Sequence, residues 1–263
     1  RWIRRLAENW ERSTLQGFGK ISTISEAMRQ RAIAKGVQNQ RARLLPNWVD
    51  LKAIQPQGLI QRASNPYRSE LSIDNGAIVL LYSGSMNNKQ GLDILTKVIH
   101  ILIGDQDLVW LLAGEGPTKA KLKKSVEGLR NVKVLPLQPV TSINEWLNIA
   151  DIHLLPQKED AADLVMPSKL LGILASGRPL VASSPADSEL GKLTEEAGIR
   201  VEPGDAEGFA TAIRRLSRDR ELRTSFGSRG RQLVEERYCR ETLLEKMEAD
   251  LLGEISQLNE GKN

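Results

Sequence analysis

The sequence is poor in the residues that build disulfide frameworks and metal centres. Cys239 is the one cysteine among 263 residues, so no disulfide can form within the chain, and this favours a reducing compartment. Of the two histidines, His100 has no cysteine or carboxylate at metal-binding spacing, and no Ser-His-Asp order is present. His153 lies inside an apolar run, where a hydrogen-bonded core histidine is more common than a base or a ligand. The sequence therefore predicts no metal site.

Long hydrophobic runs and a strong charge of one sign are also absent. No segment approaches the run of about 18 apolar residues that a membrane-spanning helix needs. The formal net charge of +4 is small and spread along the chain, which argues against nucleic acid as a partner. The chain does have the length for one large or two modest domains with a sizeable core.

From residue 76 onward, short apolar runs alternate with helical patterns. The runs that read as strands are 77–83, 109–113, 132–135, 152–155, 180–183 and 199–201. The helical patterns lie near 91–103, 117–128, 141–149, 167–176, 187–196 and 205–218, with two charged helices at 221–236 and 241–257. Apolar strands that alternate with helices indicate a parallel sheet covered on both faces. Ligands of such sheets bind beyond the carboxyl ends of the strands.

One stretch, residues 163–183 (DLVMPSKLLGILASGRPLVAS), combines a helix start with a cation. Pro167 suits the first turn of a helix, and Gly177 ends it before a buried strand. A helix start exposes free N–H groups and the positive end of the helix dipole, so it can hold a phosphate. Ser168 adds a hydroxyl there and Lys169 adds a positive charge. The alternative is a capped core helix with a surface lysine.

The same residues, MPSKLLGILASGRPLVAS, resemble the nucleotide-sugar site of retaining family 4 glycosyltransferases, which have the GT-B fold of two facing Rossmann-like domains. The resemblance is strongest to the subgroup from colanic-acid and other exopolysaccharide clusters, and it runs from about Lys20 to about Leu252. It implies an α/β fold, in which a Rossmann-like parallel sheet with helices on both faces forms the C-terminal half of a GT-B fold. A remnant of the N-terminal domain precedes this half.

The resemblance also implies a domain organisation, in which the chain is a fragment of the family's full length. Residues 1–50 correspond to the end of the N-terminal acceptor domain, because TIS and LPNWVD resemble its last part. Residues 51–75 show no sustained period and correspond to the interdomain linker, and 76–236 to the nucleotide-sugar-binding domain. The helix in 237–263 either crosses back to the N-terminal domain or packs on its own domain. Residues 1–15 form an amphipathic helix that meets either a membrane surface or a covering domain.

Two loops supply further contacts by this resemblance. After the first strand of the sheet, Gly84, Ser85 and Gly91 line the ligand, and Lys89 meets the diphosphate. Ser85 stands where the family commonly has arginine, and the loop ends in Lys-Gln-Gly instead of Lys-Gly. After the second strand, Gly114-Glu115-Gly116-Pro117 resembles the family's turn beside the nucleotide. We interpret this turn as structural, with only Gly114 and Gly116 near the ligand, and its alternative is a tight turn that starts the next helix.

Around the helix start, Met166, Ser168 and Leu170 complete the predicted nucleotide-sugar contacts. The wider family often carries two glutamates spaced E-x7-E, but the matching positions here are Leu164 and Gly172. Asp163, one residue before the first position, is the substitute candidate. Its alternative is a place in a solvated acidic loop. The residues expected to take part in catalysis are therefore Lys89, Lys169 and Asp163.

The resulting prediction is a glycosyltransferase that moves a sugar from a UDP- or GDP-linked donor to a glycan or lipid-linked acceptor in exopolysaccharide synthesis. The resemblance predicts that the configuration at the anomeric carbon is retained and that transfer needs no metal and no cofactor. We also expect a cytoplasmic location and a peripheral membrane contact through the N-terminal domain. The fragment alone is expected to bind donor without catalysing transfer. The alternatives are a non-catalytic nucleotide-sugar-binding module and a nucleotide-sugar epimerase of GT-B fold.

Overall fold

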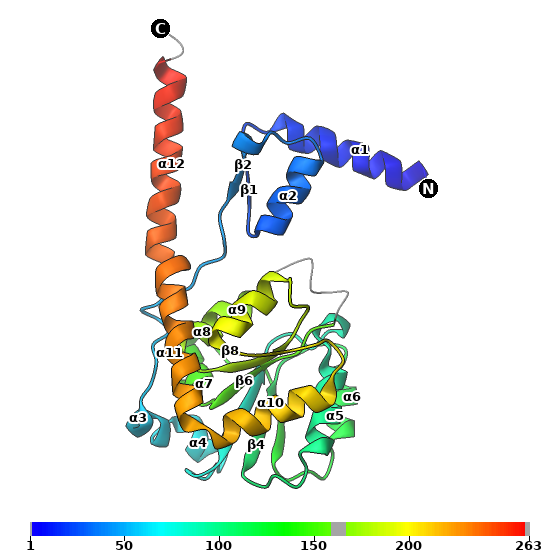
Figure 1. Cartoon of the computed structure of the whole chain (residues 1–263), viewed down its shortest axis with the longest axis vertical. Coiled ribbons are helices and arrows are strands. Elements are labelled where there is room, and N and C mark those ends of the chain that lie inside the picture. Colours follow the sequence, from blue (N-terminus) through cyan, green and yellow to red (C-terminus); the bar gives the residue numbers. More distant parts are fainter. Residues whose placement is uncertain (1, 159–166, 261–263) are drawn as a thin grey trace. The chain divides into compact units, whose positions relative to one another are not determined.

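The computed structural model of the chain describes residues 2–158 and 167–260 (Figure 1). Two predicted site residues, Asp163 and Met166, lie outside the described residues. The described residues form two compact units, one of residues 2–48 with 240–260 and the other of residues 49–158 with 167–239. No helix in the described part of the chain is both long and apolar enough to span a bilayer.

The first unit is mostly helical and has a small core. Its elements are α1 (Trp2–Gly17), β1 (Ile21–Thr23), α2 (Glu26–Ala34), the 3-10 helix η1 (Asn39–Arg41), β2 (Ala42–Leu44) and α12 (Arg240–Glu260). The strands β1 and β2 pair in parallel, and Ala32, Val37 and Ala42 are its buried apolar residues. Ser25 caps α2 by accepting a hydrogen bond from the amide of Met28 at 3.2 Å, as a serine before a helix predicts.

The second unit is built on a six-stranded parallel sheet. Its strands are β3 (Ile78–Ser83), β4 (Leu108–Ala113), β5 (Val132–Leu135), β6 (Ile152–Leu155), β7 (Leu180–Ser183) and β8 (Gly198–Val201). They lie in the spatial order β5-β4-β3-β6-β7-β8, and every neighbouring pair is parallel. The six predicted strands and the parallel sheet are confirmed.

Helices cover both faces of this sheet (Figure 1). They are α3 (Leu59–Ala63), α4 (Pro66–Glu70), α5 (Leu92–Ile101), α6 (Lys119–Ser125), α7 (Ile143–Asn148), α8 (Ser168–Ala175), α9 (Glu189–Ala197), α10 (Ala206–Arg218) and α11 (Arg220–Arg237), with the 3-10 turns η2 (Asn88–Gln90) and η3 (Val140–Ser142). Alternate residues of one strand reach different layers, because strand side chains alternate between faces. Leu80 packs with Phe209 of α10, whereas Leu81 packs with Trp146 of α7. This two-sided core keeps the strand ends fixed.

The strand order reverses between β3 and β6. The chain runs from β3 through β4 to β5 on one side, and then returns to β6 on the other side of β3. The connections after β3 and β6 therefore lead to opposite sides, to β4 and to β7, and ligands of open α/β sheets bind in a crevice at the carboxyl edge of such a switch point. The predicted helix α8 follows β6 and begins at this edge.

The segment predicted as a linker contains two short helices and packs on the sheet. Arg62 of α3 donates to both carboxylate oxygens of Asp151, at 2.7 and 2.8 Å, and Arg68 of α4 donates to one of them at 3.1 Å. Local sequence period does not reveal α3 and α4, because each is five residues long and held by distant partners. The four predicted domain ranges stay predictions.

Candidate functional site

The loops that follow β3 and β4 interlock through glycines at the carboxyl edge of the sheet. A Cβ atom on Gly114 would lie 2.0 Å from the carbonyl oxygen of Gly84, and one on Gly116 would lie 2.4 Å from that of Met86. The amide of Met86 donates to the carbonyl of Glu115 at 2.8 Å and joins the two loops. Backbone packing therefore excludes side chains at Gly114 and Gly116. Their contact with a ligand stays a prediction.

The loop after β3 also meets the segment that follows β6. Gly91 has a φ of +61° where α5 begins, a left-handed conformation that glycine adopts without strain. A Cβ atom there would lie 3.3 Å from the carbonyl carbon of Gln157. The amide of Lys158 donates to the carbonyl of Lys89 at 3.4 Å. The loop after β3 and the segment after β6 are thus in contact at Gly91, whose role in binding stays a prediction.

The start of α8 offers free backbone donors. Pro167 stands just before the helix in an extended conformation, one position earlier than the sequence predicts, and the helix begins at Ser168. In the described part of the chain, the amides of Ser168 and Lys169 donate to no acceptor, as the first turn of a helix allows. The amide of Leu170 instead donates to the carbonyl of Pro167 at 2.9 Å, and its side chain is buried. The predicted ligand contact of Leu170 therefore lacks a free donor.

Lys169 directs its ammonium group toward the loop after β3. Its Nζ donates to Oε1 of Gln90 at 3.1 Å and lies 4.2 Å from the centroid of the Tyr82 ring. Its Cδ comes within 3.3 Å of the place where a Cβ on Gly84 would be, so the absence of a side chain at Gly84 makes room for the lysine. Burial lowers the pKa of Lys169 well below its usual value, to about 7. A bound anion would stabilise the charged form of Lys169, because an opposite charge offsets the cost of burying the ammonium group.

The remaining predicted residues of this loop stay apart from Lys169. Lys89 is exposed, and its ammonium has no hydrogen-bond or ion-pair partner among the described residues. Ser85 is also exposed; its carbonyl accepts a hydrogen bond from the Tyr82 hydroxyl at 2.5 Å, and its Oγ accepts one from Asn87 at 3.1 Å. The structure therefore joins Gly84 with Lys169, and leaves Lys89 and Ser85 at the surface of the loop.

Gln90 and Tyr82 are residues of this site that sequence reasoning missed. Gln90 is the inserted residue of the Lys-Gln-Gly loop end, so the displacement of the lysine is the one signal that points to it. Tyr82 gives no signal, because it lies inside an apolar strand where an aromatic residue is ordinary. Burial raises the pKa of Tyr82 well above its usual value, so its ring faces Lys169 as a neutral aromatic surface.

His153 is a core residue, as its place in an apolar strand predicts. Its side chain is buried, and Nε2 hydrogen-bonds to the carbonyl of Leu147 at 3.1 Å. Burial first, and then the positive charge of Arg178, lowers the pKa of His153 to about 3. The imidazole is therefore neutral at physiological pH, with one nitrogen donating to the backbone. Within residues 2–158 and 167–260, no three metal-binding side chains gather.

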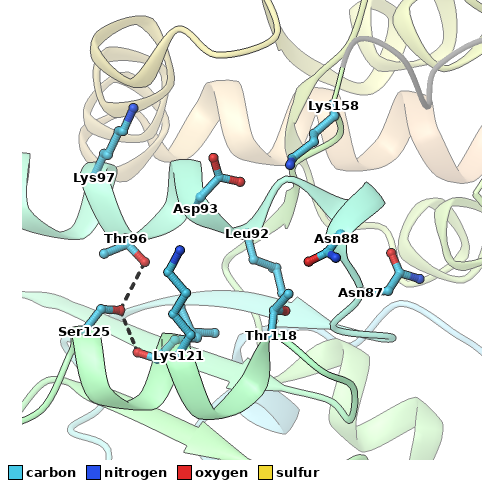
Figure 2. Close-up of a pocket in the computed structure, with 11 residues that line it drawn as sticks. Asn87, Asn88, Leu92, Asp93, Thr96, Lys97, Thr118, Lys121, Ser125 and Lys158 are labelled. Atoms are coloured by element: carbon cyan, nitrogen blue, oxygen red, sulfur yellow. Dashed lines mark hydrogen bonds between the residues drawn. The ribbon is translucent and has the colours of Figure 1, made fainter.

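A cavity of about 360 Å³ lies beside this site, between α5 and α6. Figure 2 shows Thr96 and Ser125 facing each other across the gap, where their hydroxyls form a 3.2 Å hydrogen bond. Lys97, Lys121 and Lys158 supply positive charge around it. None of the described residues that were predicted to bind donor lines this cavity. It is thus separate from the start of α8.

Comparison with protein families matches residues 77–219 to the glycosyl transferases group 1 model. The WcaI protein of Escherichia coli (strain K12), whose name assigns it to colanic acid biosynthesis as a glycosyl transferase, is 33% identical over 256 residues. That alignment covers 95% of this chain and 61% of WcaI. The N-acetyl-alpha-D-glucosaminyl L-malate synthase of Bacillus anthracis is 24% identical, with coverages of 72% and 49%. The chain thus spans about half of one relative and 61% of the other.

Solved structures share the fold at low sequence identity. Sucrose-phosphate synthase from Thermosynechococcus elongatus superposes with a TM-score of 0.77 at 19% identity, over 96% of this chain and 62% of that protein. Anabaena HepE, solved in complex with UDP and glucose, gives a TM-score of 0.75 at 15% identity, with coverages of 95% and 66%. These neighbours agree with an α/β fold of GT-B type.

Proposed function

We propose a function from the premise that this chain belongs to the glycosyl transferases group 1 family. The proposed reaction transfers a sugar from a UDP- or GDP-linked donor to a glycan or lipid-linked acceptor during exopolysaccharide synthesis. The likeness to WcaI supports the exopolysaccharide assignment. The bound UDP and glucose in HepE support a nucleotide-sugar donor.

The observation on which this proposal rests is the group of positive donors at the start of α8. The amides of Ser168 and Lys169 are free in the described part of the chain, and the Lys169 ammonium lies between Gln90 and Tyr82. All of them lie at the carboxyl edge of the sheet, next to the switch point between β3 and β6. Backbone amides and a cation in such a place suit a diphosphate.

These groups fit the chemistry of glycosyl transfer. As the bond from the sugar to the diphosphate breaks, negative charge develops on the departing oxygen. Donors fixed in advance at that oxygen stabilise the transition state more than the ground state. We assign this role to the ammonium group of Lys169 and to the backbone amides of Ser168 and Lys169. Lys89, in the loop after β3, supplies a second cation. Retention at the anomeric carbon is proposed from the family resemblance.

The same donors are the reason for proposing transfer without a metal ion, since they supply positive charge at the diphosphate. The test is titration of the chain with UDP and GDP before and after treatment with EDTA. Unchanged affinity is expected. A loss that Mg²⁺ or Mn²⁺ restores would overturn this part of the proposal and leave the donor site itself standing.

The central test is the substitution Lys169→Gln, followed by titration with UDP and GDP. A hydrogen bond to a charged group contributes about 1.5–3 kcal/mol, so we expect affinity to fall roughly 10- to 100-fold. Lys121→Gln is the matched control, because Lys121 is an exposed lysine of the neighbouring cavity and should leave affinity unchanged. Equal affinities for wild type and Lys169→Gln would remove the basis of the proposal.

A binding module without transferase activity is the second candidate, and the sequence at the E-x7-E positions favours it. A Cβ on Gly172 would lie 3.3 Å from Cδ1 of Leu147 and 3.6 Å from Cδ1 of Ile54, so a glutamate there would start among apolar side chains. Donor binding and sugar transfer therefore need separate measurement. The module is supported by tight UDP or GDP binding together with no transfer by a protein that also carries a complete N-terminal acceptor domain.

A peripheral membrane contact of the first unit is also part of the proposal. Trp2 and Trp10 of α1 are 70% and 74% exposed, and Ile3 and Leu6 of the same helix are exposed as well. Tryptophan and basic residues together favour anionic interfaces. The chain should therefore co-sediment with vesicles that contain phosphatidylglycerol. Changing both tryptophans to alanine should reduce this binding. Absence of vesicle binding would instead favour a protein surface as the partner of α1.

A further inference from the structure

A second polar cavity lies at the opposite edge of the sheet from Lys169. Its walls come from the amino ends of β3, β6 and β7, from the segment before α3, and from the first turns of α11. The volume is about 590 Å³, which is within the range of small-molecule sites. Its charged lining consists of Arg62, Arg178, Arg220, Arg223 and Asp151. Four guanidinium groups thus face one carboxylate.

Asp151 has no acceptor capacity left for the other arginines of the cavity. It accepts two hydrogen bonds from Arg62, one from Arg68 and one from the amide of Val79 at 2.8 Å. A carboxylate has about four lone-pair sites, so these bonds saturate it. The formal charge of the lining is therefore positive, and it is not neutralised by the carboxylate at its centre.

Arg178 and Arg223 are held by neutral groups. Nη2 of Arg178 donates to the carbonyl of Gln57 at 2.8 Å, and Nη1 of Arg223 donates to the carbonyl of Ser217 at 2.7 Å. In the described part of the chain, no carboxylate lies within ion-pair distance of either. Burial first, and then the nearby charge of Arg62, lowers the pKa of both guanidinium groups, and the carboxylate of Asp151 opposes this. The cavity therefore concentrates positive charge, and the burial and mutual repulsion of these groups lower the stability of the folded chain.

We propose that this cavity binds a small phosphate-bearing molecule, at a site separate from the donor site. Guanidinium groups present planar forks that match phosphate oxygens, and several of them around one cavity favour an anion with more than one charge. Anchoring of the segment 51–75 explains Arg62 and Arg68, which already pair with Asp151. It also explains Arg178, which donates to the carbonyl of Gln57 in that segment, but it does not explain Arg220 and Arg223 of α11. The proposal does not depend on the transferase reaction.

The test uses the full chain with the substitution Lys169→Ala, which removes the cation of the α8 site. Inorganic pyrophosphate is titrated into this variant by calorimetry at constant ionic strength. Binding of one pyrophosphate per chain is expected to persist. Adding Arg220→Gln should weaken it at least fivefold, and Arg220 is an exposed side chain, so the fold should survive its loss. Arg218→Gln is the matched control, because it removes an exposed charge near the cavity but outside its lining.

Three results would overturn the proposal. One is loss of pyrophosphate binding in Lys169→Ala alone, which would assign the anion to the donor site. Another is an equal effect of Arg220→Gln and Arg218→Gln, which would indicate diffuse surface charge. The third is undiminished binding in Arg223→Lys, which keeps the charge but removes the fork. Failure of the donor-site proposal is distinct, because it is measured with UDP and GDP on Lys169→Gln.

Discussion

At the residue scale, the environment of Lys169 predicts a pH dependence of donor binding. Burial holds the pKa of Lys169 at about 7 in the free protein, and a bound diphosphate raises it because an opposite charge favours the protonated form. Below pH 7 the lysine is already charged, so affinity is at its highest. As pH rises above 7, binding requires proton uptake, and affinity falls towards tenfold per pH unit until the pKa of the complex is reached.

The measurement is titration with UDP between pH 6 and pH 9, in buffers of different ionisation enthalpy. Proton uptake on binding appears as a dependence of the measured heat on the buffer, and it should be largest near pH 8. Lys169→Gln should abolish both the uptake and the slope, because glutamine does not titrate. A slope that persists in this variant would mean that another group takes up the proton.

At the element scale, the contact between the loops after β3 and β4 predicts a position-dependent cost of adding a methyl group. Gly114→Ala places a Cβ 2.0 Å from a backbone oxygen, which no side-chain movement can relieve. We expect the free energy of unfolding in urea to fall by about 3 kcal/mol, the upper end for overpacking. Gly104→Ala is the control, because nothing lies within 4 Å of its Cβ position, and it should stay within about 1 kcal/mol of wild type.

The anchoring of α3 and α4 predicts a large effect of a single carboxylate. Asp151→Asn keeps the size of the side chain but leaves Arg62 and Arg68 without a counter-charge. Breaking a buried ion pair on one side costs about 3–5 kcal/mol, and urea unfolding should record a loss of that order. Asp105→Asn removes a more exposed partner of Arg214 and should cost about 1 kcal/mol or less. Equal costs would mean that the Asp151 network does not hold the segment.

At the scale of the whole molecule, the distribution of core residues predicts that the second unit folds without the first. The three larger apolar clusters, which include Trp110, Trp146 and Phe209, lie within residues 49–239, whereas the core of the first unit consists of small residues. The fragment 49–239 should therefore show a cooperative thermal transition within a few degrees of the full chain. A non-cooperative transition would show that the sheet depends on residues outside this range.

Much of the fold was predictable because secondary structure follows local pattern. The strands β3 to β8 and the longer helices were placed from apolar runs and helical spacing, and the core position of His153 followed from its neighbours in the sequence. The helix start at Ser168 and Lys169 was visible for the same reason. The short helices α3 and α4 were missed, because each depends on an arginine that reaches a distant aspartate.

The sequence by itself determined which segments become strands and helices, and which helix start carries a lysine, because these properties depend on residues a few positions apart. Only the tertiary structure decided what that lysine meets. Gln90 contacts Lys169 across 79 positions, and Arg62 contacts Asp151 across 89. The strand order that reverses beside β3 is likewise a matter of three-dimensional packing. Contacts of this kind form only when the whole core assembles, so no local pattern records them.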